Sequence, residues 1–191
     1  PEKSKNSYEH NDFHNLADDS RPFGSLLGYV VEGLYQSREE VISAGQAAAR
    51  VGGLKYADLN GDGKISEADR TWIFNPVPNF SYGLNIDLEW KNFDFNMFWQ
   101  GVAGVDVINS QKYQTDFWSL TDPGSNKGDR LLGAWNAGNT GSSIPALTLS
   151  NSADEGRLST YFVENGSYLK LRTLQIGYNL PIYLIKKIHM S

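Results

Sequence analysis

Residues 80–100 have the sequence FSYGLNIDLEWKNFDFNMFWQ, and this stretch decides the fold of the chain. Every second residue over Phe80–Trp90 is apolar, and the residues between them are polar or glycine. The alternation returns in residues 93–99, with Phe98 as the exception. Because successive side chains of a strand point to opposite faces, the pattern predicts two antiparallel strands with one apolar and one polar face. Lys91-Asn92 is the predicted turn between them.

The length of these strands and the chemistry of their faces leave two interpretations open. The first is a soluble sheet that packs on a core by its apolar face. The second is a membrane hairpin, because about ten residues per strand is the length that crosses a bilayer. Trp90 and Phe93 flank the turn, where the interfacial aromatic residues of a barrel lie. The predicted polar face suits a water-filled lumen and carries Asn85, Asp87, Glu89, Asp94, Asn96 and Gln100.

The segments before the hairpin predict a polar loop, a strand and a short helix. Residues 1–22 are polar and rich in turn formers, whereas residues 23–36 are mostly apolar with glycine punctuation and predict a strand. Ser37 has the character of a helix N-cap, and the acidic residues that follow it suit the positive end of a helix dipole. We therefore expect a helix over residues 37–50, ended by Gly52-Gly53.

Residues 58–69, DLNGDGKISEAD, have the layout of a twelve-residue calcium loop. The predicted ligands are the backbone carbonyl of Lys64 and the side-chain oxygens of Asp58, Asn60, Asp62 and Asp69. Gly63 lies where the loop must turn sharply, and Ile65 is predicted to anchor the loop to a core. Asp69 stands at position twelve, where the longer Glu is usual. The alternative is a turn without an ion, since Asp, Asn and Gly all favour turns.

The second half of the chain predicts a long loop followed by two more strands. Residues 101–156 are rich in Gly, Asn, Ser and Asp, and barrels carry loops of this length more often than compact soluble domains do. Strands are predicted at residues 157–164 and 168–180, the latter with Leu174, Ile176, Tyr178 and Leu180 on its apolar face. Four aromatic residues of the long loop are predicted to bind substrate by stacking, or alternatively to pack within the loop: Tyr113, Phe117, Trp118 and Trp135.

Composition and missing motifs exclude several classes of function. The chain has 191 residues, a net charge of -5 and no cysteine, so neither nucleic-acid binding nor disulfide, thiol or Cys-based zinc chemistry is expected. No apolar run approaches the roughly 18 residues of a membrane helix. His10 and His14 are expected to be solvated rather than ligands. No nucleophile elbow, phosphate-binding loop or dinucleotide fingerprint occurs, so we do not expect an enzyme.

Several stretches resemble, in the same order, the SusC/RagA family of TonB-dependent outer-membrane transporters from Bacteroidetes. They are residues 28–37 (GYVVEGLYQS), 55–70 around the calcium loop, 78–85 (PNFSYGLN), 91–101 (KNFDFNMFWQG) and 164–181 (ENGSYLKLRTLQIGYNLP). The resemblance covers roughly residues 20–190. The family's plug domain and closing strands fall outside it, so we expect a C-terminal portion of a transporter whose barrel this chain alone does not close.

The resemblance implies a mainly β chain: antiparallel strands of a large transmembrane β-barrel, long extracellular loops, one short helix and an EF-hand-like calcium loop. The implied division is a polar loop (1–22), a strand with an extracellular loop (23–78), a barrel hairpin (79–100), a long extracellular loop (101–156), and barrel strands with a periplasmic turn (157–191). All belong to one barrel domain.

The implied function is import of oligosaccharides or peptides across the outer membrane of a Gram-negative cell, with energy from TonB. The implied partners are a SusD-like surface lipoprotein, outer-membrane lipid, and the TonB complex through a part of the transporter that precedes Pro1. The rival interpretation is a soluble, extracellular, β-rich glycan-binding module stabilised by calcium.

Overall fold

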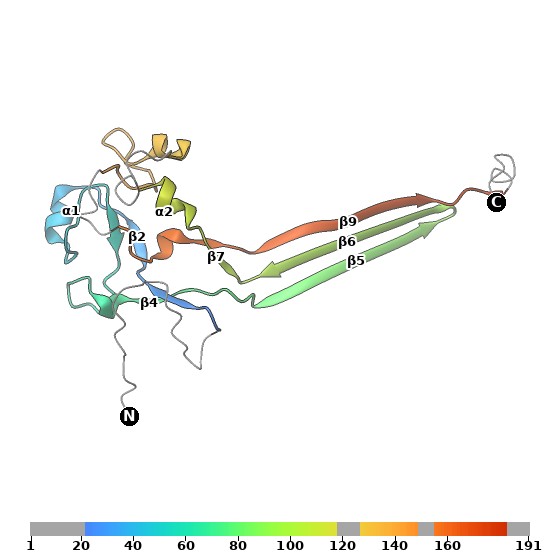
Figure 1. Ribbon diagram of the computed structural model, residues 1–191, viewed down its shortest axis with the longest axis horizontal. Helices are drawn as coiled ribbons and strands as arrows, with labels where there is room; N and C mark the ends of the chain where they lie inside the picture. Colours follow the sequence, from blue (N-terminus) through green and yellow to red (C-terminus); the bar gives the residue numbers. More distant parts are fainter. Residues whose placement is uncertain (1–21, 118–126, 149–154, 183–191) are drawn as a thin grey trace, which may run out of the picture. The chain divides into compact units, whose positions relative to one another are not determined.

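The computed structural model describes residues 22–117, 127–148 and 155–182 (Figure 1). Its elements in chain order are β1 (Leu26–Gly28), β2 (Val31–Leu34), α1 (Arg38–Ser43), β3 (Leu54–Tyr56), η1 (Glu67–Asp69), β4 (Thr71–Phe74), β5 (Phe80–Trp90), β6 (Phe93–Ala103), β7 (Asp106–Ile108), α2 (Gln111–Thr115), η3 (Asp129–Gly133), η4 (Thr160–Phe162), β8 (Val163–Asn165) and β9 (Tyr168–Tyr178), where η marks a 3₁₀ helix.

The chain forms two compact units. The loop unit comprises the described residues up to Pro76 together with residues 106–164, and the sheet unit comprises residues 77–105 and those from 165 onward. The loop unit holds the short strand pairs β1-β4 and β2-β3, and the sheet unit holds the three longest strands. The mainly β character predicted from the sequence is confirmed.

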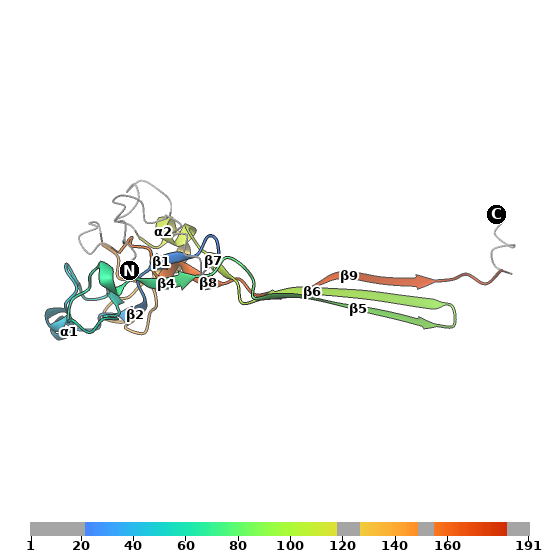
Figure 2. The same cartoon turned by 90° about the horizontal axis from the view of Figure 1, so that it is seen from below.

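The sheet unit is a three-stranded antiparallel sheet in the order β5-β6-β9 (Figure 2). β5 pairs with β6 without interruption, so the predicted hairpin and its turn at Lys91-Asn92 are confirmed. Leu84 lies opposite Trp99, and Ile86 lies opposite Met97. Residues directly opposite each other in an antiparallel pair share a face, so the alternating apolar residues of both strands lie together.

A β-bulge in β9 keeps the apolar side chains of all three strands on one face. Phe98 pairs with Thr173, but the next residue, Trp99, pairs with Leu171. Arg172 is therefore one extra residue in β9, and the side-chain alternation of this strand shifts by one there. The β9 residues on the apolar face are Leu169 and Leu171 before the bulge and Leu174, Ile176 and Tyr178 after it. Sequence analysis missed the first two because it assumed an unbroken period of two.

Gly101 leaves room for the ring of Tyr82 on the apolar face. A Cβ atom at this position would lie 2.5 Å from the ring and 2.5 Å from the backbone oxygen of Tyr168. The backbone oxygen cannot rotate away, so the sheet would have to shift. We expect Gly101→Ala to lower the free energy of unfolding by about 1–3 kcal/mol, measured from the urea midpoint of the refolded protein. Gly133→Ala is the matched control, since nothing lies within 4 Å of a Cβ there; equal effects of the two would contradict the steric explanation.

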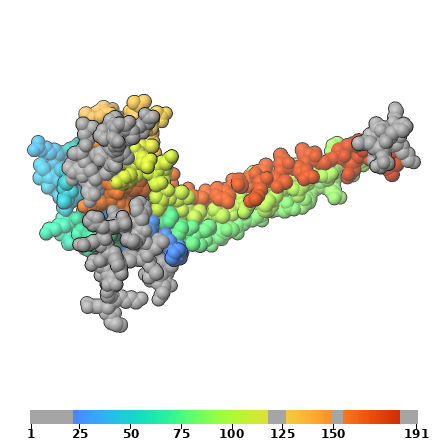
Figure 3. All heavy atoms as spheres, in the orientation of Figure 1, coloured from blue at the N-terminus to red at the C-terminus, as the bar shows by residue number. Residues whose placement is uncertain are grey.

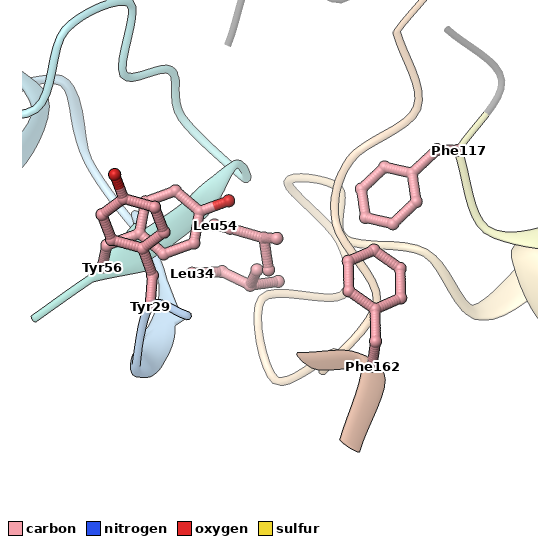
Figure 4. Packing of buried hydrophobic residues seen from close by; sticks show 6 residues of the cluster. All are labelled: Tyr29, Leu34, Leu54, Tyr56, Phe117 and Phe162. Atoms are coloured by element: carbon pink, nitrogen blue, oxygen red, sulfur yellow. The ribbon is translucent and has the colours of Figure 1, made fainter. Parts of the chain in front are cut away.

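The loop unit is built around a small hydrophobic core (Figure 4). Its buried members are Tyr29, Leu34, Leu54, Tyr56, Phe117 and Phe162. The rings of Tyr29 and Tyr56 lie 5.3 Å apart, and those of Phe117 and Phe162 lie 5.8 Å apart. The predicted anchor Ile65 packs against this core, which confirms that prediction. The core therefore joins chain segments that precede the hairpin to segments that follow it.

Residues 23–50 form shorter elements than predicted. The single strand predicted over residues 23–36 is wrong, because β1 and β2 pair with different strands, β4 and β3. Ser37 caps α1 as predicted, and its Oγ accepts the N–H of Glu40 at 3.2 Å. The helix ends at Ser43 rather than at residue 50, because the backbone of Ala44 is extended, and a separate turn follows in which the Ala49 N–H donates to the Gln46 carbonyl.

Later segments also differ from the predictions. β6 continues to Ala103 and residues 106–133 contain β7, α2 and η3, so the segment predicted as an irregular loop is partly ordered. The strand predicted over residues 157–164 is a 3₁₀ turn followed by β8, and the last strand ends at Tyr178. Predictions for residues 1–21 and 183–191 lie outside the described residues.

Candidate functional site

The long strands of the sheet unit lie at the molecular surface (Figure 3). Large apolar side chains on one face of this sheet are exposed. Leu84 is 56% exposed, Trp90 is 66% exposed and Ile176 is 70% exposed. A soluble sheet buries such a face beneath a second layer, and no described residue of this unit forms one. Contiguous apolar surface of this kind marks contact with a membrane or with another protein.

Aromatic side chains gather at the end of this face that is next to the Lys91-Asn92 turn. The rings of Phe93 and Tyr178 lie 4.7 Å apart. Lys91 Nζ lies 4.5 Å from the centroid of the Trp90 ring. Aromatic rings and a lysine suit the boundary between hydrocarbon and water, since each has an apolar body and a polar end.

The opposite face of the sheet is polar and internally hydrogen-bonded. Asp87 accepts hydrogen bonds from the side-chain amides of Asn85 and Asn96. Arg172, the extra residue of the bulge, donates to Gln100 Oε1 at 2.8 Å. These side chains hydrogen-bond to one another and are exposed to solvent, as residues that line an aqueous channel are.

Phe98, the exception in the alternating pattern, lies on this polar face. A Cβ atom at Gly83 would lie 3.1 Å from the Phe98 ring. The ring therefore packs over the backbone that the glycine leaves open, which explains how the polar face accommodates it.

The predicted calcium loop folds so that its polar side chains bind its own backbone. Asp58 accepts the N–H groups of Gly61 at 2.8 Å and of Gly63 at 2.7 Å. Asn60 Oδ1 accepts the N–H of Asp62 at 2.8 Å. Gly61 and Gly63 have φ angles of 75° and 79°, which are favourable only for glycine. The sharp turn expected at Gly63 is confirmed.

Asp69 is the buried end of the same loop. Its Oδ1 accepts the N–H of Leu59 at 3.0 Å and its Oδ2 accepts the N–H of Ser66 at 2.7 Å. The Ser66 hydroxyl in turn accepts the N–H of Ala68, so the two residues cap η1 reciprocally. The hydrogen bond from Ser66 N–H, followed by those from Asn60 and Leu59, lowers the pKa of Asp69 below its ordinary value, against the opposing effect of burial.

This pKa shift predicts that the loop opens in acid. A carboxyl whose pKa is lower in the folded state stabilises the fold above its ordinary pKa, here 3.8, and this contribution is lost as the pH falls through the lower folded-state value. We expect Asp69→Asn to remove this pH dependence of stability. We also expect it to speed hydrogen exchange of the Leu59 and Ser66 amides at neutral pH. Unchanged exchange at both amides would show that the carboxylate does not hold the loop.

The donor set of the loop suits a hard cation, although its side chains are turned toward the backbone. Three carboxylates and one amide oxygen within one twelve-residue loop are the ligand types that Ca²⁺ prefers. Among the described residues, however, no three His, Cys, Asp or Glu side chains converge as a metal centre would need. The residues fit the ion chemically, and each carboxylate oxygen can accept an N–H and still ligate. His10 and His14 lie outside the described residues.

The predicted aromatic substrate residues are dispersed. Phe117 is 3% exposed and packs in the core, as the alternative of packing within the loop requires. Trp135 Nε1 donates to Gln36 Oε1 at 2.9 Å, and its ring lies against Gly52. Tyr113 is 39% exposed at the margin of the core. Trp118 lies outside the described residues.

Two buried polar clusters of the loop unit were missed by sequence analysis. Glu155, 1% exposed, contacts Arg50 Nη2 at 2.6 Å and accepts the N–H of Leu54 at 3.2 Å. Asp116 accepts the Tyr161 hydroxyl at 2.6 Å, and burial followed by this hydrogen bond raises the pKa of Tyr161. Glu155 follows Asp154 in the sequence, and neighbouring acids give no sign of which one will be buried.

Comparisons with known proteins agree with this geometry. No family model matches the chain. TonB-dependent receptor P3 of Formosa agariphila is 36% identical over 163 residues, which cover 83% of this chain and 15% of that protein. TonB-dependent receptor SusC of Bacteroides thetaiotaomicron is 27% identical over 153 residues, which cover 80% of this chain and 14% of that protein. A chain of the RagAB peptide importer in its open-open state has a TM-score of 0.57 at 22% identity, over 84% of this chain and 16% of that chain.

The relatives and the fold define the class as a TonB-dependent receptor. The chain belongs to this family, and its similarity to SusC over 80% of its length confirms the resemblance read from the sequence. It spans about 15% of the length of the curated relatives that it matches. No helix among the described residues is long and apolar enough to cross a membrane.

Proposed function

We propose that the chain forms part of the wall and of the outer loops of an outer-membrane importer powered through TonB. The observation that carries this proposal is the β5-β6-β9 sheet, which has an exposed apolar face and a hydrogen-bonded polar face. Each of its strands has 11 residues, enough to cross the hydrocarbon layer when tilted. In the barrel, the apolar face would contact lipid and the polar face would line the lumen.

The edges of the sheet support the same proposal. Within the described residues, β5 and β9 each pair with β6 alone, so each has one open edge. An open edge is not tolerated in lipid, because its backbone N–H and C=O groups would lack partners. Further strands of the complete receptor would therefore pair with β5 and β9.

A soluble, calcium-stabilised glycan-binding module is the second candidate. The loop unit favours it, because that unit has its own core. The sheet unit opposes it, because a soluble module would leave the apolar face in water. Partition into detergent after extraction of whole cells separates the two: the proposed importer is expected in the membrane fraction, and a module in the soluble one.

The proposed partners follow from the family. The loops of the loop unit are proposed to be extracellular, and a SusD-like lipoprotein would cover the extracellular mouth of the barrel. The TonB complex would act on a part of the receptor beyond this chain. The proposed cargo is an oligosaccharide, with a peptide as the alternative.

Growth of the source bacterium tests the transport function. Deletion of the gene is expected to abolish growth on one class of purified oligosaccharide supplied as the sole carbon source, and the intact gene on a plasmid should restore it. If the deletion strain loses growth only on peptides, the inferred cargo is a peptide rather than an oligosaccharide. Unchanged growth on both classes would contradict the proposal.

Tyr113 is the described aromatic residue of the predicted set that is most available for stacking on cargo. We expect Tyr113→Ala to weaken uptake of a saccharide cargo and Tyr113→Phe to retain it, because stacking uses the ring rather than the hydroxyl. Equal uptake by both variants would assign Tyr113 to the margin of the core.

We also propose that the loop of residues 58–69 binds one structural Ca²⁺. Asp58, Asn60, Asp62, the Lys64 carbonyl and Asp69 would hold the ion. Bound there, it would neutralise carboxylates that otherwise repel one another, and it would require the side chains to turn partly from the backbone toward a common point. The supporting observations are the donor set and the two glycines that shape the turn.

Calorimetry on the complete receptor in detergent tests the ion. Wild-type protein stripped with EDTA is expected to bind one more Ca²⁺ than the Asp58→Ala variant, because position one is central to ion coordination. Glu67→Gln is the matched control, since Glu67 is an exposed acid of the same loop outside the predicted ligand set. Identical stoichiometry in wild type and Asp58→Ala would contradict the site.

A further inference from the structure

Gly45, just after α1, lies directly against the backbone of the 58–69 loop. A Cβ atom at Gly45 would lie 1.7 Å from the carbonyl oxygen of Gly63, so only glycine fits this contact. The Ile65 N–H donates to the Gly45 carbonyl at 3.2 Å, which holds the two backbones together. The loop and the segment after α1 therefore cannot move independently.

Gln46 extends the contact into the sheet formed by β2 and β3. Its Oε1 accepts the Tyr35 hydroxyl at 3.2 Å and the Tyr56 N–H at 3.1 Å. Its Nε2 donates to the Leu54 carbonyl at 2.9 Å. The side chain is 7% exposed, so displacing it would leave buried polar groups without these hydrogen bonds.

We propose that the contact formed by Gly45 and Gln46 couples the 58–69 loop to the β2-β3 sheet, so that an ion bound in the loop orders the sheet as well. The effect on the sheet rests on the proposed calcium site, whereas the coupling itself rests on the contacts above. A shift of Gly63 would displace Gly45 and, with it, the neighbouring Gln46. Linkage then requires that ordering of the sheet tighten ion binding by the same factor.

The proposed coupling also involves α1, a helix that does not pack in the hydrophobic core. No residue of α1 is buried, and the helix is fixed by the Ser37 cap at one end and by the Gly45 contact beyond the other. A cavity of about 370 Å³ lies beside this contact, with Glu32, Tyr35, Glu40, Lys55 and Asp58 among its lining residues. Ion binding would therefore also set the shape of an outward-facing cavity that is wholly within the loop unit.

Hydrogen exchange on the complete receptor, with excess Ca²⁺ or with EDTA, tests the coupling at single amides. The reporters are the Ile65 amide, which crosses the contact, the Tyr56 amide, which binds Gln46, and the Tyr35 amide, which donates to the Gly53 carbonyl at 3.1 Å. Calcium is expected to slow exchange at all three. Gly45→Ala should weaken calcium binding about tenfold and speed exchange at Tyr35 and Tyr56, whereas the control Gly133→Ala should do neither.

Gln46→Met supplies a second variant, which leaves the backbone contact with the loop intact. Calcium should still slow exchange at Ile65 in this variant but no longer at Tyr35. Protection confined to the loop in the wild type, or equal behaviour of Gly45→Ala and Gly133→Ala, would overturn the coupling. If the wild type binds no calcium, the proposed calcium site is wrong. The coupling is then tested without the ion: it is supported if Gly45→Ala speeds exchange at Tyr35 and Tyr56 and Gly133→Ala does not, and it is contradicted if the two variants behave alike.

Discussion

Leu84→Arg is expected to prevent the receptor from folding stably into membranes. Leu84 lies near the middle of β5 on the exposed apolar face, opposite Trp99. In the barrel this position would face hydrocarbon near the bilayer midplane, where an arginine costs about 2–4 kcal/mol. Folding into lipid vesicles, followed by the difference in gel mobility between folded and heated protein, measures the effect.

Asn85→Arg is the matched control for this prediction. Asn85 is the next residue of β5 and lies on the polar face, so an arginine there would project into water. We expect it to fold like the wild type. If the two variants fold equally well, the apolar face does not contact lipid, and the soluble module becomes the better interpretation of the sheet.

Glu155→Ala is expected to give the largest loss of stability in the loop unit. The substitution would leave Arg50, whose side chain is 20% exposed, without its carboxylate, and would leave the Leu54 N–H without its acceptor. Removing one partner of a buried ion pair costs about 3–5 kcal/mol, because the remaining charge stays desolvated. The Leu54 amide donates directly to Glu155, so its hydrogen-exchange rate reports this loss at the residue concerned.

Glu67→Ala breaks an exposed Glu–Arg ion pair and serves as the comparison. Glu67 contacts Arg70 at 3.1 Å, but its side chain is 80% exposed. Pairs of this kind contribute about 0–1 kcal/mol. A similar change in the exchange rate of the Leu54 amide in the two variants would show that burial does not determine how much the Arg50–Glu155 pair contributes to stability.

The hairpin was predictable because apolar and polar residues alternate along Phe80–Trp90 and, apart from Phe98, along residues 93–99. A period of two over Phe80–Trp90 indicates a strand whether the sheet is soluble or in a membrane, and the register follows once the turn at Lys91-Asn92 is placed. The turn at Gly63 and the cap at Ser37 were predictable for a similar reason, since each depends on neighbouring residues alone.

The loop unit was less predictable because contacts between distant residues decide its structure. Gly52 was assigned as a helix stop, but in the structure it lies against the ring of Trp135, which is far along the chain. Nothing near Glu155 in the sequence indicates that Arg50 will neutralise it. The bulge at Arg172 was missed because its effect is visible only when β9 is aligned with β6.

The bulge at Arg172 also bears on how this strand can change length during evolution. A single residue inserted or deleted elsewhere in β9 would reverse the faces of all side chains on one side of the change. In the proposed barrel, leucines would then face water and polar groups would face lipid. At the bulge, in contrast, loss of Arg172 alone would place Leu171 next to Thr173 and give a regular strand in which every remaining side chain keeps its present face. Related receptors should therefore differ in length by a single residue at this point more readily than elsewhere in the strand, with the apolar pattern unchanged on both sides of it.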